Sequence, residues 1–376
     1  MSERLTAVRR ALADAPADRV VECLAEVVAK EYAAGDLELL LVDYRLAALL
    51  PLFSGPPVTR PGDPAWRCFD HQVEVTAGLV SYLPVTARGE RMGVLRHSPA
   101  PSSQLERAEL AEIATLLAHE LKAAGAGTDR YAVAARTQRL TLAAEMQWEL
   151  LPGRCRVEPE FSLAGQLEPA YAVRGDGFDW AEHDGRLFVA VLNGMGEGVT
   201  AALLSSLAVN ALRNARRAGL NLADQAALTD QAIFSQHRGE AHVDALLLEL
   251  DPRSGELTIV DTGSPRMMVL RVGEVIDQPL EPQFPFGMFE ASDYETRTLQ
   301  LVCGDRLFIV SDGVADAAGE TGRYGDMALH RFVRRTASLA PLQAVRSLLG
   351  DLRAFVSADL EDDAVAVCLD WTGPRH

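Results

Sequence analysis

The sequence contains few cysteines, and no two of them lie close together along the chain. The five cysteines are scattered over its whole length (Cys23, Cys68, Cys155, Cys303 and Cys368). A disulfide framework and a cysteine-based zinc site both need closely and regularly spaced cysteines, so the sequence excludes both. The pattern is typical of reduced thiols in a cytoplasmic protein.

The sequence also lacks long apolar runs and an excess of basic residues. No uncharged apolar run approaches the roughly 18 residues of a membrane-spanning helix, and the N-terminal MSERLTAVRR lacks the apolar segment of a signal peptide. With 36 Lys and Arg against 53 Asp and Glu, the net charge is −17. This charge repels nucleic acids and anionic membranes and is compatible with divalent cations. We therefore expect a cytoplasmic protein that binds neither nucleic acid nor membrane.

A chain of 376 residues is longer than a typical single hydrophobic core, so two domains are expected. Residues 1–123 have helix-like spacing of apolar residues near both ends and strand-like runs between them, which predicts an α+β domain. Arg88-Gly89-Glu90 lies between two strand-like runs and predicts a hairpin turn. The small residues of GAGTD, 125–129, predict a boundary after this domain.

The runs LELLLVDY and LPVTARGERMGVL, with the helical pattern that follows them, resemble segments of a GAF domain. This resemblance implies that residues 1–123 form a GAF-like sensor domain, although its proline-rich middle looks short for a ligand pocket. His71 and His97 are candidates to face a ligand, and the alternative for each is an ordinary surface or core position. The sequence does not identify the ligand.

Residues 130–151, RYAVAARTQRLTLAAEMQWELL, have a second helical pattern that closes at Pro152-Gly153. The pattern predicts a linker helix between two domains. Val133, Leu140 and Gln147 follow heptad spacing, which is compatible with a homodimer through paired linker helices. The alternative is a helix that packs on its own domain.

From residue 152 to residue 372 strand-like runs dominate, and helical patterns lie between them. The strand-like runs are FSLAGQL, RLFVAVL, VDALLLEL, ELTIVDT, MMVLRV, RTLQLV, RLFIV and AVAVCLD, and the helical patterns span 199–217, 223–236, 326–336 and 341–357. Long strands joined by short turns, with a few interspersed helices, predict an α/β sandwich of two antiparallel sheets flanked by helices. The fold class predicted for the whole chain is therefore α+β.

Acids or an amide stand beside glycine or a second acid at several predicted strand or loop ends. These positions are Asp176 in RGDGFD, Asn193-Gly194 in LNGMGEG, Asp312-Gly313 in VSDGVAD, and Asp362-Asp363 in EDDAVAV. Strand ends are rigid, so oxygen atoms there can face a common point, and oxygen ligands suit Mg²⁺ or Mn²⁺ rather than zinc. The alternative for each position taken alone is an ordinary turn.

Taken together and in order, these motifs resemble the PPM-type serine/threonine phosphatases, in particular the branch of the SpoIIE and RsbU-like bacterial phosphatases. The resemblance runs from about Met146 to Trp371 and includes MQWELLP, LNGMGEGVTAALL, ALLLELDPRSGELTIVDTGSP, FPFGMF and GDRLFIVSDGVAD. It implies hydrolysis of phosphoserine or phosphothreonine by a water activated by two Mn²⁺ or Mg²⁺ ions, without a covalent phosphoenzyme. Relatives of this type act on phosphorylated anti-sigma-factor antagonists, which implies a phosphoprotein partner.

The resemblance also assigns the metal ligands. It places Asp176, the residue at 193, Asp312 and Asp362 in the ligand positions, with the carbonyl of Gly194 as a further ligand. Asp179 and Asp363 are auxiliary candidates that could hold waters or a further ion, and the alternative is that they are merely solvated.

Asn193 departs from the family pattern, which has aspartate at the position that bridges the two ions. Two divalent ions are balanced by four carboxylates, so a neutral amide at 193 leaves a net positive charge and weakens the second ion. Smaller departures are Ser264, where the family usually has histidine, and Asp244, where threonine is common. Two functions remain open: a phosphatase of reduced activity, or an inactive pseudophosphatase that binds a phosphoprotein or an anti-sigma partner.

A nucleotide-binding loop is a weaker alternative for the glycines that follow Asn193. Gly194, Gly196 and Gly198 follow a predicted strand and precede a predicted helix, as in dinucleotide-binding folds. Their spacing is GxGxG rather than GxGxxG, and no strand with a terminal acid follows about 20 residues later. The sequence therefore favours a metal centre at this turn.

Overall fold

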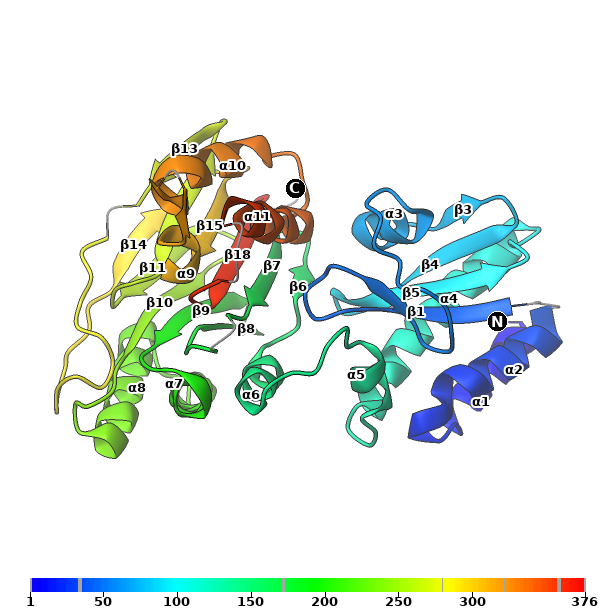
Figure 1. Cartoon of the computed structure of the whole chain (residues 1–376), viewed down its shortest axis with the longest axis horizontal. Coiled ribbons are helices and arrows are strands. Elements are labelled where there is room, and N and C mark those ends of the chain that lie inside the picture. Colours follow the sequence, from blue (N-terminus) through cyan, green and yellow to red (C-terminus); the bar gives the residue numbers. More distant parts are fainter. Residues whose placement is uncertain are drawn as a thin grey trace. The chain divides into compact units, whose positions relative to one another are not determined.

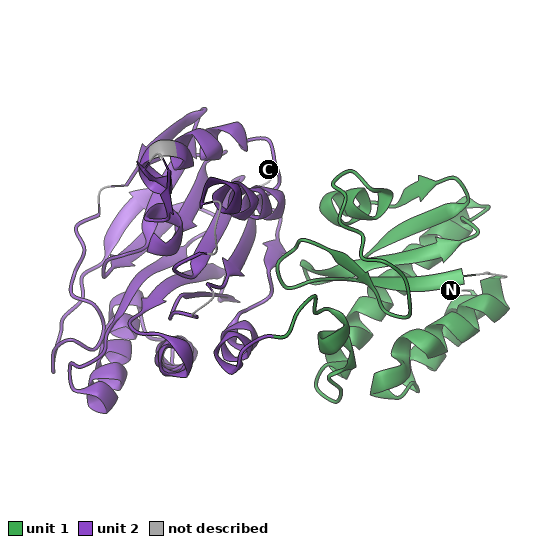
Figure 2. Cartoon of the chain, viewed as in Figure 1, with its two compact units in different colours: residues 1–139 green, residues 140–376 purple. Residues whose placement is uncertain are grey.

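The computed structural model of the chain is shown in Figure 1, and it describes residues 2–32, 36–170, 173–278, 280–320, 322–356 and 360–374. The chain divides into two compact units, residues 1–139 and residues 140–376 (Figure 2). Within the described ranges, no helix combines the length and the apolar character needed to cross a membrane.

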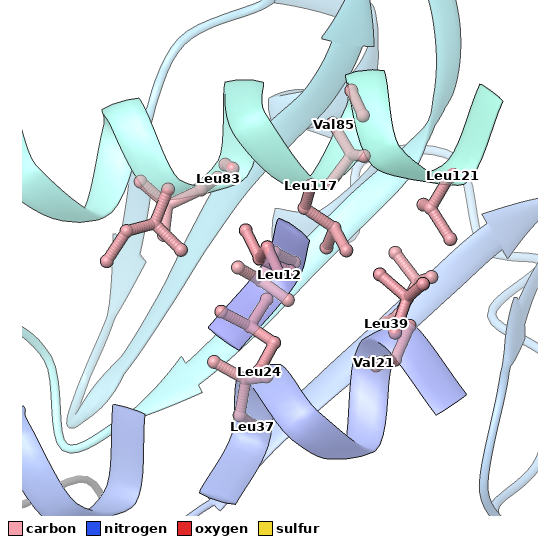
Figure 3. Close-up of a cluster of buried hydrophobic side chains, with 14 of the residues drawn as sticks. Leu12, Val21, Leu24, Leu37, Leu39, Leu83, Val85, Leu117 and Leu121 are labelled. Carbon is pink, nitrogen blue, oxygen red and sulfur yellow. The ribbon is translucent and has the colours of Figure 1, made fainter. Parts of the chain in front are cut away.

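Unit 1, residues 1–139, is an antiparallel sheet with helices packed against it. Its elements are α1 (Glu3–Ala13), η1 (Ala17–Arg19), α2 (Val20–Tyr32), β1 (Asp36–Val42), β2 (Leu49–Pro51), α3 (Pro64–His71), β3 (Val75–Ala77), β4 (Val80–Ala87), β5 (Glu90–Ser98), α4 (Gln104–Ala124) and α5 (Arg130–Ala134). The strand order in the sheet is β2-β1-β5-β4-β3. Figure 3 shows Leu117 and Leu121 of α4 gathered with Leu24 of α2 and Leu39 of β1 in the core between the helices and the sheet.

The hairpin predicted at residues 88–90 is confirmed. Strand β4 ends at Ala87 and β5 begins at Glu90, and the two residues between them have positive φ angles, 50° at Arg88 and 87° at Gly89. Such two-residue turns match the twist of the strands that they join. Of the two candidate histidines, His71 is exposed and His97 is buried in β5, so His97 takes the core position that was its alternative.

The single linker helix predicted over 130–151 is wrong. The structure has two short helices there, α5 (Arg130–Ala134) and α6 (Leu142–Leu150). Thr141 starts the second helix because its hydroxyl accepts a hydrogen bond from the backbone N–H of Ala144 at 3.2 Å. Tyr131 of α5 belongs to the core of unit 1, whereas α6 belongs to unit 2. The three heptad positions therefore do not share one helix, and the predicted paired helix has no continuous element to form it.

The boundary between the two units also differs from the prediction. It falls after Arg139, not within residues 125–129, because α5 packs into the first unit.

Unit 2, residues 140–376, contains two large antiparallel sheets. Its elements after α6 are β6 (Cys155–Val157), β7 (Phe161–Glu168), β8 (Gly177–His183), β9 (Arg186–Gly194), α7 (Gly198–Arg217), α8 (Leu222–His237), β10 (Val243–Leu250), β11 (Glu256–Asp261), β12 (Arg266–Arg271), β13 (Glu274–Asp277), β14 (Arg297–Gln300), β15 (Arg306–Val310), α9 (Asp312–Ala315), β16 (Ala318–Gly319), β17 (Gly322–Arg323), η2 (Gly325–Leu329), α10 (His330–Arg335), α11 (Pro341–Val356) and β18 (Ala364–Trp371). The five-stranded sheet has the order β14-β11-β10-β9-β8, and the six-stranded sheet has the order β13-β12-β15-β18-β7-β6.

The two sheets pack face to face with helices on their outer sides, as the sequence predicts. Val191, Leu246 and Val367 belong to the core between the sheets. Helices α7 and α8 cover the outer face of the five-stranded sheet, and α10 and α11 cover that of the six-stranded sheet (Figure 1). Alternate residues of each strand face the two layers, so the side chain of a residue at a strand end points either between the sheets or toward the helices.

Candidate metal centre

The predicted ligands lie at one end of the sandwich. Gly177 pairs with Leu192, so Asp176 and Asn193 lie one residue beyond this pair at the β8–β9 end of one sheet. In the other sheet Val310 pairs with Ala366, so Asp312 after β15 and Asp362 before β18 also lie together.

Asn193 joins the two sheets at this end. Its Nδ2 donates hydrogen bonds to Oδ2 of Asp312 at 2.6 Å and to Oγ of Ser264 at 2.9 Å. The side chain lies on the same face of β9 as Val191, which belongs to the core between the sheets. Asn193 is thus in direct contact with Asp312, and the charges of Asp312 and Asp362 both act on Asp176.

Asp176 is the most deeply buried of the three acids predicted as metal ligands, with 1% of its surface exposed. Neither of its carboxylate oxygens, nor Oδ1 of Asp312, has a well-formed hydrogen bond within the described residues, and the hydroxyl of Ser311 is the polar neighbour that acts on Asp176. Burial raises the pKa of Asp176 well above its usual range, and the charge of Asp312 adds to this effect. Buried carboxylate oxygens without a partner are costly, and a bound cation would satisfy them. These oxygens suit the divalent ions that the resemblance implies, although no three His, Cys, Asp or Glu side chains among the described residues already form a metal site.

Asp362 and Asp312 line a cavity of about 340 Å³. Burial raises the pKa of Asp362, the charge of Asp312 raises it further, and the guanidinium of Arg174 opposes both effects. Arg174 lines the same cavity, so a cationic side chain stands beside the two carboxylates. This arrangement suits a phosphate group that would lie between bound cations and an arginine.

Gly194, the predicted carbonyl ligand, lies directly against Gly175. Its N–H donates to the carbonyl of Gly175 at 3.0 Å, and a Cβ on Gly175 would collide with the carbonyl of Gly194. Glycine at both positions lets the turn after β9 approach the loop that carries Asp176.

Asp363 has structural partners rather than a free carboxylate. It accepts hydrogen bonds from Nε2 of Gln147 at 2.7 Å and from the backbone N–H groups of Ala170 and Arg174, both at 2.8 Å. Burial raises its pKa to about 6. Nε2 of Gln147 also donates to the carbonyls of Arg174 at 2.7 Å and Asp176 at 3.1 Å. Asp363 and Gln147 therefore hold the loop that positions Asp176.

Asp179, the other auxiliary candidate, is buried between strand β8 and helix α7. It accepts from Nη2 of Arg213 at 2.9 Å and from Nη2 of Arg216 at 3.3 Å. The alternative that Asp179 and Asp363 are merely solvated is wrong, because both are buried and bonded within the protein. Arg213 and Arg216, one helical turn apart in RNAR, were the sequence signal for the partner of Asp179.

Asp244 lies on strand β10 directly opposite Asn193. Burial raises its pKa to about 6; the charge of His242 opposes this effect, and the charges of Asp312 and Asp261 add to it. An additional carboxylate therefore lies close enough to the predicted ligands to interact with their charge.

Residues 183–372, about half of the chain, match the family model of Stage II sporulation protein E (SpoIIE). The chain belongs to the SpoIIE family. This confirms the resemblance to PPM-type phosphatases, and the match lies wholly within unit 2. The GAF-like assignment of residues 1–123 stays a prediction.

Three solved structures with a TM-score of 0.50 support the SpoIIE-type fold. They are the RsbU and RsbW domains of Rv1364c from Mycobacterium tuberculosis (23% identity, covering 60% of this chain and 64% of that one), the SiaA-PP2C domain of Pseudomonas aeruginosa (22%, 56% and 85%), and the PP2C phosphatase domain with a fragment of the regulatory domain of SpoIIE from Bacillus subtilis (19%, 58% and 65%). The chain thus spans less than two thirds of the first and third structures. A comparison with curated proteins finds no match.

Proposed function

We propose that unit 2 is a metal-dependent phosphatase that removes phosphate from serine or threonine of a regulatory protein. The observation that carries this proposal is the buried carboxylate of Asp176, which has no well-formed hydrogen bond within the described residues and faces the charge of Asp312 in a SpoIIE-family fold. Asp176, Asp312 and Asp362 would hold Mn²⁺ or Mg²⁺, with the side-chain oxygen of Asn193 and the carbonyl of Gly194 as neutral ligands.

Bound ions of this kind lower the pKa of water and offset the negative charge of a phosphate group. The other contributions come from the protein itself. Arg174 would bind phosphate oxygens from the side of the cavity, because its backbone is held by Asp363 and Gln147 while its side chain lines the cavity. The hydrogen bonds of Gln147 would keep the loop of Asp176 in place when the site is empty or loaded.

We propose a phosphorylated anti-sigma-factor antagonist as the substrate class. The support is the resemblance to the SpoIIE and RsbU-like branch and the structural similarity to a protein that contains both an RsbU and an RsbW domain. The acidic net charge of the chain, −17, argues against nucleic acid as a partner.

Phosphate release from phosphoserine and phosphothreonine peptides, measured with Mn²⁺ and with EDTA, tests the activity. Asp312→Asn should abolish Mn²⁺-dependent release because it removes charge directly from the ion site while it keeps the shape of the side chain. Glu249→Gln, which removes a carboxylate at the far end of strand β10, should leave release unchanged. Undiminished release by Asp312→Asn, with an unchanged melting temperature, would show that the ligand assignment is wrong.

A second function, a pseudophosphatase that binds a phosphoprotein, is favoured by one observation. The amide of Asn193 donates to Asp312, so a neutral donor occupies the position at which the family has a bridging carboxylate. Such a protein would bind a phosphorylated partner more tightly than the unphosphorylated one and would release no phosphate at any Mn²⁺ concentration. The same peptides, used in a binding assay beside the release assay, separate the two functions.

A further inference from the structure

Asp244 lies on strand β10 at the position paired with Asn193 on strand β9. In the pairing of β9 with β10, Asn193 lies opposite Asp244 and Val191 lies opposite Leu246. Val191 and Leu246 both point into the core between the sheets. Because side chains alternate along a strand, Asn193 and Asp244 point into the same space at its end, and directly paired residues have Cβ atoms about 5 Å apart.

The turn after β11 fixes the direction of the Asp244 carboxylate. A Cβ built on Gly263 would lie 2.5 Å from Oδ1 of Asp244, so the carboxylate fills the space that glycine leaves at this position. Gly263 has a φ of 116°, which a residue with a side chain rarely adopts. The next residue, Ser264, accepts the hydrogen bond from Asn193. Asp244 and Asn193 therefore reach the same turn.

Within the described ranges no hydrogen bond or ion pair to the carboxylate of Asp244 occurs, its side chain is half-buried, and the one cationic side chain whose charge acts on it is His242. In lacking such a bond Asp244 differs from Asp179, which is paired with two arginines, and from Asp363, which accepts three hydrogen bonds. Asp244 thus retains both oxygens for a cation.

We propose that Asp244 supplies the metal centre with the carboxylate that position 193 lacks, so that a hard divalent cation, Mn²⁺ or Mg²⁺, binds between β10 and Asp312. This inference rests on the proposed function and names a ligand of the same site. With Asp176, Asp312 and Asp362, Asp244 restores a set of four carboxylates, which matches the charge of two divalent ions. The aspartate absent from one strand is thus replaced by an aspartate at the paired position of the next strand.

Calorimetric titration of Mn²⁺ into the full chain tests the inference without reference to activity. Asp244→Asn keeps the size of the side chain and should weaken the binding of one Mn²⁺ ion by roughly 10–100-fold, the range that even supporting residues of metal sites show. Glu249→Gln removes the same charge from the same strand away from the site and should bind Mn²⁺ as the wild-type chain does. In the double variant Asn193→Asp/Asp244→Asn, the carboxylate returns to the paired position and the affinity should recover.

Two results would overturn the inference in different ways. Unchanged Mn²⁺ affinity in Asp244→Asn would exclude Asp244 as a ligand and leave the proposed function standing. No Mn²⁺ binding by the wild-type chain would overturn both proposals. Mn²⁺ binding that depends on Asp244, without phosphate release from any peptide, would support the inference and count against the proposed phosphatase.

Discussion

Asn193 changes the electrostatics of the site in the absence of metal. Its amide donates to Oδ2 of Asp312 at 2.6 Å, so a hydrogen bond stands where a carboxylate would place a second negative charge beside the first. We therefore expect the neutral residue to stabilise the metal-free protein and to weaken the attraction for cations. On the proposed ligand assignment, a charge at position 193 should lower the stability of the metal-free fold and raise the affinity for metal.

Asn193→Asp should consequently lower the melting temperature in EDTA and raise the stabilisation that Mn²⁺ gives. The new carboxylate repels Asp312 until an ion lies between them, and Mn²⁺ affinity should then rise by at least roughly 10-fold, the smaller effect typical of residues around metal sites. Thermal unfolding in EDTA and over a series of Mn²⁺ concentrations measures both effects. Ser264→Ala is the control, because it removes a hydrogen bond of Asn193 without adding charge. Equal Mn²⁺-induced shifts in the wild-type chain and in Asn193→Asp would show that position 193 does not limit metal binding.

His97 gives unit 1 a predictable response to pH. It is 1% exposed, and burial lowers its pKa, an effect that the charge of Glu106 opposes. The unfolded chain, with a histidine pKa of about 6.5, then binds more protons than the folded chain in the interval between the two pKa values. Stability is therefore full above about pH 6.5 and is lost as the pH falls.

Hydrogen exchange of the β4–β5 amides should show this loss. Protection, corrected for intrinsic exchange rates, should decrease from pH 7.5 to pH 5.5 in the wild-type chain and change less in His97→Leu. An equal decrease in both proteins would assign the pH response to other groups.

At the scale of elements, helix α6 is the first helix of unit 2 and holds the loop of the candidate site through hydrogen bonds. Gln147 lies on this helix and donates to the backbone of the Asp176 loop and to Asp363. A movement of α6 would therefore be transmitted to Asp176 through hydrogen bonds rather than through a continuous helix from unit 1.

Gln147→Ala should weaken Mn²⁺ binding by roughly 10-fold and lower the free energy of unfolding by about 1–3 kcal/mol. The first effect follows from a looser Asp176 loop, and the second from buried acceptors that lose their donor. Glu149→Ala, at an exposed position of the same helix, should change neither quantity. Calorimetry and urea unfolding provide the measurements, and an unaltered Mn²⁺ affinity in Gln147→Ala would separate α6 from the site.

Many of the helices and strands could be predicted from the sequence, whereas the hydrogen-bond partners of Asp179 and Asp363 could not. Strand β10 was predicted with its observed bounds because VDALLLEL is a short apolar run that ends at the turn residues 251–255, too short for a typical helix. The break before α6 depends on the Thr141 cap within a segment otherwise suited to helix. Asp179 and Asp363 were placed near the site, but Arg213 lies 34 residues from the first and Gln147 lies 216 residues from the second. Only the folded chain shows that these acids are already paired.

At the scale of the whole molecule, the two units are joined by a non-helical segment, residues 135–141. Arg139 is exposed there, whereas Arg130 lies in α5 and pairs with Glu22 of the same unit. Brief digestion with trypsin should therefore cut first after Arg136 or Arg139 and leave two stable fragments. Mass spectrometry of the fragments identifies the bond, and a first cut after Lys122 or Arg130 would move the boundary back to residues 125–129.

The position of β7 in the six-stranded sheet has a consequence for any shortened form of the chain. Strand β7 pairs with the apolar strand β18 from Phe161 to Glu168, and it lies before residue 183, where the family match begins. A polypeptide cut to the limits of that match would lack Asp176 and would present the open edge of β18 to solvent, which favours self-association into aggregates. The shortest piece that keeps this edge covered and includes Asp176 starts at β7, and a piece that also keeps Gln147 starts at α6. We therefore expect a polypeptide cut to the limits of the family match to aggregate and to lack one of the proposed metal ligands.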